Sequence, residues 1–294
     1  MSESAEPELK RLSKRDRAAW WDVITSEGSA LGLLDCRVML ENKLVNDIFF
    51  EGTFKGKPCI VKCSSRAPES IANEYEMSRR LFAAEPLACA EPLALWRSPD
   101  GRRAFVVTRR LSGPSLTDMF VRGIAQDEAV DCLEDMVRIA TALADSGIVW
   151  RDIIPDNLLR DSDGHLKLID AQFAIDRAAY REDPWLLAHW KYRTLLFAFH
   201  PTVAGHGWDD VGMMLRYARY FPSNDRVKAL QDRLRGLVAR TVFPVACGRV
   251  DDLRMALCLV GMLIARPFAS KRRRRVLRER ICRAKAFLSR RRSW

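Results

Sequence analysis

The chain has 294 residues, enough for one large or two modest domains with a substantial apolar core. Apolar residues make up 48% and charged residues 30%, which excludes a disordered or fibrous chain and is typical of a globular protein. The net charge is +11, and twelve Lys or Arg with a single acid in residues 271–294 account for all of it. A neutral body with a basic tail predicts an anionic partner for the tail.

Eight cysteines are scattered without a Cys-x-x-Cys pair, and the four histidines share no metal-ligand spacing with them. The first residues are acidic and contain no apolar stretch, so no secretory signal is visible. We therefore expect reduced, mostly buried thiols in a cytoplasmic protein, and no zinc site.

Residues 1–34 predict a helical extension, which the adjacent Trp20 and Trp21 would pack onto the body. Between Cys36 and Lys62, runs of branched and aromatic residues with a turn at residues 55–57 predict three antiparallel strands. A helix over residues 71–82 and a β-hairpin over residues 93–108 follow, and a linker containing Gly113 ends this part of the chain.

Apolar positions between Glu128 and Ala144 recur at intervals of three and four, and Gly147 follows them. This pattern predicts an amphipathic helix that ends just before Trp150. Residues 213–263 are expected to be helical throughout, with breaks near Pro222 and Pro244.

A second hairpin is predicted between residues 158 and 169, with its turn at Asp163-Gly164. Asp152 and Asn157 precede this hairpin and Asp170 follows it, so the hairpin would bring these three oxygen-bearing side chains together. Such ligands suit Mg²⁺, which takes few protein groups in addition to substrate phosphates.

Arg151-Asp152, followed after four residues by Asn157, resembles the catalytic loop of the protein-kinase-like superfamily. Asp170 stands where that family has the metal-binding Asp of Asp-Phe-Gly. Lys62 matches the family's strand lysine, and Glu74 matches the helix glutamate that pairs with it. The amino-acid sequence of residues 151–170 is most similar to that of the corresponding segment in small bacterial kinases of the lipopolysaccharide core sugars Kdo and heptose.

This resemblance implies an α+β, two-lobed protein-kinase-like fold. The small antiparallel-sheet N-lobe would cover residues 35–112, and the mainly helical C-lobe residues 113–268. Asp210 would brace the backbone of the catalytic loop.

The resemblance also implies an ATP- and Mg²⁺-dependent phosphotransferase. Asp152 would accept or orient the proton of a hydroxyl, and Asn157 and Asp170 would hold Mg²⁺. Lys62, set by Glu74, would face the nucleotide phosphates as a point charge.

Three departures from the family pattern favour an alternative, a membrane-tethered pseudokinase that serves as a binding module. Trp150 stands in place of the loop histidine, and Ala171-Gln172 replaces Phe-Gly. The segment of residues 41–47, where the family has its phosphate loop, contains no glycine.

Residues 269–294 predict a basic amphipathic tail helix, with an apolar face formed by Leu277, Ile281, Ala284 and Leu288. An anionic membrane surface suits this pattern, while docking on the C-lobe and binding of RNA remain alternatives. No peptide-docking marker follows Asp170, so we expect a lipid-linked saccharide as acceptor, with a protein Ser/Thr kinase as the alternative. The protein would then lie peripherally on the inner face of the cytoplasmic membrane.

Overall fold

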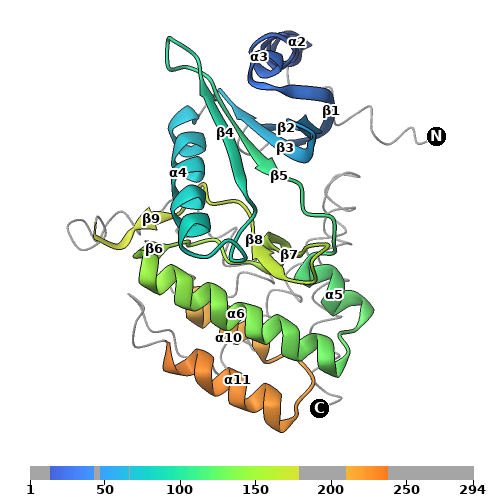
Figure 1. Ribbon diagram of the computed structural model, residues 1–294, viewed down its shortest axis with the longest axis vertical. Coiled ribbons are helices and arrows are strands. Elements are labelled where there is room, and N and C mark those ends of the chain that lie inside the picture. The colour runs from blue at the N-terminus through green and yellow to red at the C-terminus, as the bar shows by residue number, and fades with distance from the viewer. Residues whose placement is uncertain (1–13, 43–46, 66, 179–209, 238–294) are drawn as a thin grey trace, which may run out of the picture. The chain divides into compact units, whose positions relative to one another are not determined.

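The computed structural model describes residues 14–42, 47–65, 67–178 and 210–237 (Figure 1). The chain is α+β, as predicted, and divides into two compact units. The sheet unit takes in the chain up to Pro86, with Ala90–Leu111 and Ala171–Phe173. The helical unit comprises Leu87–Cys89, Ser112–Asp170 and the chain from Ala174 onward.

The sheet unit is built on five antiparallel strands in the order β1-β2-β3-β5-β4. The strands are β1 Leu33–Asn42, β2 Asp47–Phe54, β3 Lys57–Ser64, β4 Pro92–Arg97 and β5 Ala104–Arg109. Lys55 and Gly56 both have positive φ, which suits a tight turn between twisted strands, so the predicted turn is confirmed. β3 lies in the middle of the sheet, between β2 and β5.

The predicted N-terminal helix is present from residue 14 as α2 Lys14–Val23, the π-helix η1 Ile24–Gly28 and the short α3 Ser29–Leu31. Trp20 is 2% exposed and joins Ile24, Leu33 and Phe50 in the core of the sheet unit. Trp21 remains 43% exposed, but its ring centroid lies 6.1 Å from that of Phe50, so both tryptophans contact the body and only Trp20 is buried.

α4 Pro68–Ala84 lies along the sheet beside β4 and β5 (Figure 1). Pro68 occupies the first turn of α4, where its missing N–H costs no hydrogen bond. The helix therefore starts three residues before the predicted start at Ile71. Ile71 is fully buried and packs with Ala104 and Val106 of β5.

The helical unit is organised around α6 Gln126–Ser146, which packs on α10 and α11 (Figure 1). Gly147 adopts a left-handed conformation and ends α6, as predicted. The remaining elements are α5 Leu116–Arg122, β6 Ile148–Val149, η2 Pro155–Asn157, β7 Leu158–Arg160, β8 Leu166–Leu168, β9 Ile175–Asp176, α10 Asp210–Ala218 and α11 Asp225–Gly236.

The predicted break near Pro222 is confirmed, because α10 ends at Ala218 and α11 begins at Asp225. The predicted break near Pro244 and the tail helix of residues 269–294 lie outside the described residues. In the part of the chain that the structure describes, no helix has the length and hydropathy needed to span a bilayer.

The five cysteines among the described residues are free thiols, and Cys59, Cys63, Cys89 and Cys132 are buried. Burial raises the pKa of Cys59, Cys89 and Cys132 to about 12. These thiols are therefore protonated and unreactive at neutral pH, in agreement with the structural role predicted for them.

Candidate functional site

Lys62 and Glu74 form a buried ion pair in the sheet unit. β3 carries Lys62 and α4 carries Glu74, and the Lys62 Nζ lies 2.8 Å from the Glu74 Oε2. Both residues are 5% exposed. Glu76, two residues further along the same helix, is half-buried and pairs with Arg79 instead. The predicted pairing of Lys62 with Glu74 is confirmed, and the pair is buried.

Gln172 is a second acceptor for the same amine and was not recognised from the sequence. Its side-chain Oε1 accepts a hydrogen bond from the Lys62 Nζ at 3.0 Å. The Phe49 ring on the neighbouring strand lies 5.8 Å from that nitrogen, within the range of a cation–π contact. Lys62 is thus held by a carboxylate, an amide oxygen and an aromatic ring.

The predicted catalytic loop folds back on itself in the helical unit. The Asn157 Nδ2 donates to the backbone oxygen of Asp152 at 2.9 Å and to its carboxylate Oδ2 at 3.3 Å. Ile154 N–H donates to the same backbone oxygen at 2.9 Å, and the 3₁₀ turn η2 closes the loop. Asp152 and Asn157 are 4% and 8% exposed, so the structure brings these two predicted residues together in a buried setting.

Asp210, the first residue of α10, holds the start of this loop. Its carboxylate accepts the backbone N–H of Trp150 at 2.7 Å and that of Arg151 at 2.9 Å. Tyr217 on the same helix donates through its hydroxyl to the backbone oxygen of Ile153 at 3.2 Å. The predicted bracing by Asp210 is therefore present, and α10 fixes the loop backbone on both sides of Asp152.

Asp170 follows the predicted hairpin, which forms between β7 and β8. Ile169 N–H donates to the backbone oxygen of Asn157 at 3.0 Å, so the chain returns to the end of the catalytic loop just before Asp170. Four non-glycine residues in the described chain have positive φ, and Arg151 and Asp170 are two of them. Strained backbone of this kind concentrates at functional sites, so the position of both residues supports a functional loop.

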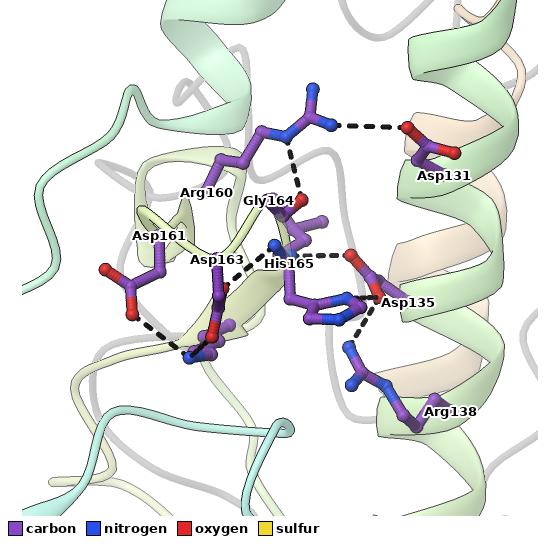
Figure 2. A network of polar contacts seen from close by, with 10 residues as sticks. Asp131, Asp135, Arg138, Arg160, Asp161, Asp163, Gly164 and His165 are labelled. Atoms are coloured by element: carbon purple, nitrogen blue, oxygen red, sulfur yellow. Dashed lines mark hydrogen bonds and ion pairs between the residues drawn. The ribbon is translucent and has the colours of Figure 1, made fainter.

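α6 clamps this hairpin through a network of ion pairs and hydrogen bonds, which Figure 2 shows. The Asp135 carboxylate accepts the Leu166 N–H at 2.6 Å and contacts His165 and Arg138. Arg160 bridges the Gly164 backbone oxygen and Asp131 of α6. The hairpin that separates Asn157 from Asp170 is thereby fixed to a long helix.

The carboxyl groups of Asp135 and Asp163 in this network have pKa values shifted from their usual range. Burial raises the pKa of Asp135 above its usual range, although Leu166 N–H, Arg138 and His165 each lower it. Burial alone would also raise the pKa of Asp163, but the Lys167 hydrogen bond, the His165 N–H and nearby charges bring it below its usual value. Lys167 itself is 4% exposed and pairs with Asp161 at 3.0 Å.

Asn157 and Asp170 carry an amide oxygen and a carboxylate, and oxygen groups of this kind are the ligands that Mg²⁺ takes in proteins. Among the described residues, no group of three or more His, Cys, Asp or Glu side chains is arranged to hold a metal ion. Mg²⁺ needs only one or two protein oxygens beside phosphate and water. Asn157 bonds Asp152 through its amide nitrogen, so those bonds do not use the amide oxygen, and Asp170 supplies a carboxylate.

No protein-family model matches the chain, and no curated protein is significantly similar to it.

Proposed function

We propose that the protein is an ATP- and Mg²⁺-dependent phosphotransferase of protein-kinase-like architecture, which transfers a γ-phosphoryl group to a hydroxyl. The observation that carries this proposal is the folded-back loop, in which Asn157 bonds Asp152 and Asp210 holds the two preceding N–H groups. Phosphoryl transfer depends on positioning and electrostatics more than on covalent chemistry, so a rigidly held carboxylate is the feature that it requires.

Asp152 receives the proton of the acceptor hydroxyl as the new O–P bond forms and the bond to the ADP oxygen breaks. Lys62, oriented by Glu74, offers its ammonium group to the α- and β-phosphates. Asn157 and Asp170 would hold Mg²⁺. When bound, this ion neutralises part of the charge on the phosphate oxygens.

For the acceptor we propose a sugar hydroxyl of a lipid-linked saccharide, such as a lipopolysaccharide core sugar. The basic tail of residues 271–294 supports this choice, because an anionic membrane surface would bring the enzyme to such a substrate. On this proposal the protein works at the inner face of the cytoplasmic membrane. The alternatives are a protein Ser/Thr kinase, which has a protein acceptor, and an enzyme whose basic tail binds RNA.

A radiolabelled ATP assay with Mg²⁺ tests the acceptor and the role of Asp152 together. Lipid-linked saccharide precursors and a generic protein substrate are offered side by side. We expect label on the saccharide, and a loss of at least about 100-fold in Asp152→Asn, because a general base contributes about 10² to 10⁴ in rate. Asp156→Asn changes the same chemistry within the same loop and is expected to retain activity within about threefold.

Label on the protein substrate alone would replace the saccharide with a protein acceptor. Full activity in Asp152→Asn would show that another group takes the proton.

One observation favours the pseudokinase alternative: Trp150, in the position of the family's histidine, is fully buried. A thermal-shift titration with MgATP separates the two functions, since a ligand at 100 times its Kd stabilises by about 2.7 kcal/mol. Stabilisation together with phosphoryl transfer supports the enzyme, and stabilisation without transfer to any acceptor supports the binding module. If MgATP neither stabilises the protein nor supports phosphoryl transfer, both the enzyme and the binding module are contradicted.

A further inference from the structure

Glu74 and Gln172 both accept hydrogen bonds from the Lys62 amine, and these two acceptors differ in charge. The Glu74 carboxylate lies at 2.8 Å and the Gln172 amide oxygen at 3.0 Å. Lys62 is 5% exposed, so its ammonium group has lost most of its water and depends on protein acceptors. The amide oxygen accepts one N–H and adds no negative charge of its own.

Gln172 also follows a constrained piece of backbone. Ala171, which precedes it, is fully buried, and Asp170 is two residues earlier in the chain with φ of 65°. A non-glycine residue in this conformation persists only where its surroundings enforce it. The bond from Lys62 to Gln172 is one contact that restrains the segment immediately after Asp170.

We propose that Gln172 is a positioning residue that ties the segment carrying Asp170 to the Lys62 amine, so that Mg²⁺ at Asp170 and phosphates at Lys62 strengthen each other's binding. This inference rests on the proposed function, because it assigns Gln172 a part in the same nucleotide site. Kinases of the resembled family have glycine at the corresponding place of Asp-Phe-Gly, and glycine has no side chain with which to make this contact.

The coupling between two ligands is reciprocal, so the effect of Mg²⁺ on nucleotide affinity measures it directly. Isothermal titration of ATP into the full chain, once with Mg²⁺ and once with EDTA, gives two Kd values whose ratio is the coupling factor. Gln172→Met keeps the length of the side chain and removes the acceptor. Gln172→Leu is a second acceptor-free variant, and Gln172→Glu keeps the acceptor. Gln126→Met makes the same change at an exposed glutamine in the first turn of α6.

We expect the coupling factor to fall about tenfold or more in Gln172→Met and Gln172→Leu, because a hydrogen bond to a charged group is lost. Gln172→Glu should keep the factor within about threefold of the unaltered protein. It should bind ATP more weakly in both conditions, because the added charge repels phosphate. Gln126→Met should match the unaltered protein throughout.

A merely structural Gln172 predicts a different result. The acceptor-free variants would then melt at lower temperature and lose affinity equally with and without Mg²⁺, which leaves the coupling factor unchanged. That outcome would overturn the inference and leave the proposed function intact. Failure of the unaltered protein to bind ATP in either condition would overturn the proposed function, and the inference with it.

Discussion

At the scale of single residues, the buried amine of Lys62 is held by the Glu74 carboxylate and the Gln172 amide oxygen. Lys62 and Glu74 were recognised by their resemblance to the strand lysine and helix glutamate of the kinase-like family, and the structure pairs them. Gln172 and Lys167 carry no pattern of their own. Their partners lie on other elements or across a turn, and only the folded chain brings them together.

The contribution of Asp163 to the free energy of unfolding should depend on pH, and the direction of that dependence follows from its pKa. Its pKa is held below the usual value of 3.8, so the folded state favours the ionised carboxylate. Its stabilising contribution is therefore present above pH 3.8 and is lost as the pH falls through the lowered pKa of the folded state.

Asp163→Asn keeps the side-chain oxygen that accepts the His165 N–H in the turn and removes the charge that faces Lys167. Because Asp163 is 35% exposed, we expect a loss of at most about 1 kcal/mol in the free energy of unfolding at pH 7. Urea unfolding from pH 7 to pH 2.5 measures the difference, which should shrink below pH 3.8. A difference that stays constant over this range would show that turn geometry, and not charge, is responsible.

At the scale of elements, local patterns predicted strands and helices well because hydrophobic periodicity and turn residues are local properties. The hairpin of β7 and β8 formed at Asp163-Gly164, and α6 ended at Gly147. The π-helix η1 was not predicted, since a single wider turn leaves no periodic signal. Bracing by Asp210 was suggested only by family resemblance, because its contacts reach back 59 and 60 residues along the chain.

Gly113 tests how closely the segment before α5 approaches the hairpin. A Cβ at this position would lie 2.0 Å from the backbone oxygen of Arg160, and Arg160 N–H donates to the Pro114 oxygen at 3.0 Å. Backbone cannot move aside as a flexible side chain can. We therefore expect Gly113→Ala to lower the free energy of unfolding by about 1–3 kcal/mol.

Gly236→Ala is the matched control, because Gly236 ends α11 with no atom within 4 Å of its Cβ position. Alanine is the better helix former, so this change should be neutral or stabilise by up to about 1 kcal/mol. Urea midpoints at unchanged m-value report both effects. Equal midpoints for Gly113→Ala and the unaltered protein would show that the segment can move away from Arg160 without cost.

At the scale of the whole molecule, each of the two units holds its own group of the residues named in the proposed function. Lys62, Glu74 and Gln172 belong to the sheet unit, and Asp152, Asn157 and Asp170 belong to the helical unit. Each group is internally held by short contacts of its own. Chain order alone does not predict this membership, because Gln172 lies two residues after Asp170 and yet belongs to the sheet unit, where it bonds Lys62.

The basic tail supplies the last prediction, because its charge is separate from a neutral body. Deletion of Lys271–Trp294 removes the whole net charge of +11. Each basic residue near an anionic surface contributes about 1 kcal/mol, so the full chain should sediment with vesicles rich in anionic lipid and remain in solution with neutral ones. Sedimentation should weaken as salt rises, since the Debye length falls from about 10 Å at 0.1 M to about 3 Å at 1 M.

The truncated protein should lose vesicle binding while its melting temperature and its MgATP response stay unchanged. If the full chain does not bind vesicles and the truncated protein melts at a lower temperature than the full chain, the tail instead docks on the protein's own surface. Retention of RNA by the full chain, with no sedimentation on anionic vesicles, would assign it to nucleic acid. Equal sedimentation of the full and truncated chains would remove the membrane from the proposed function, and the lipid-linked acceptor would then have to be supported by the labelling assay alone.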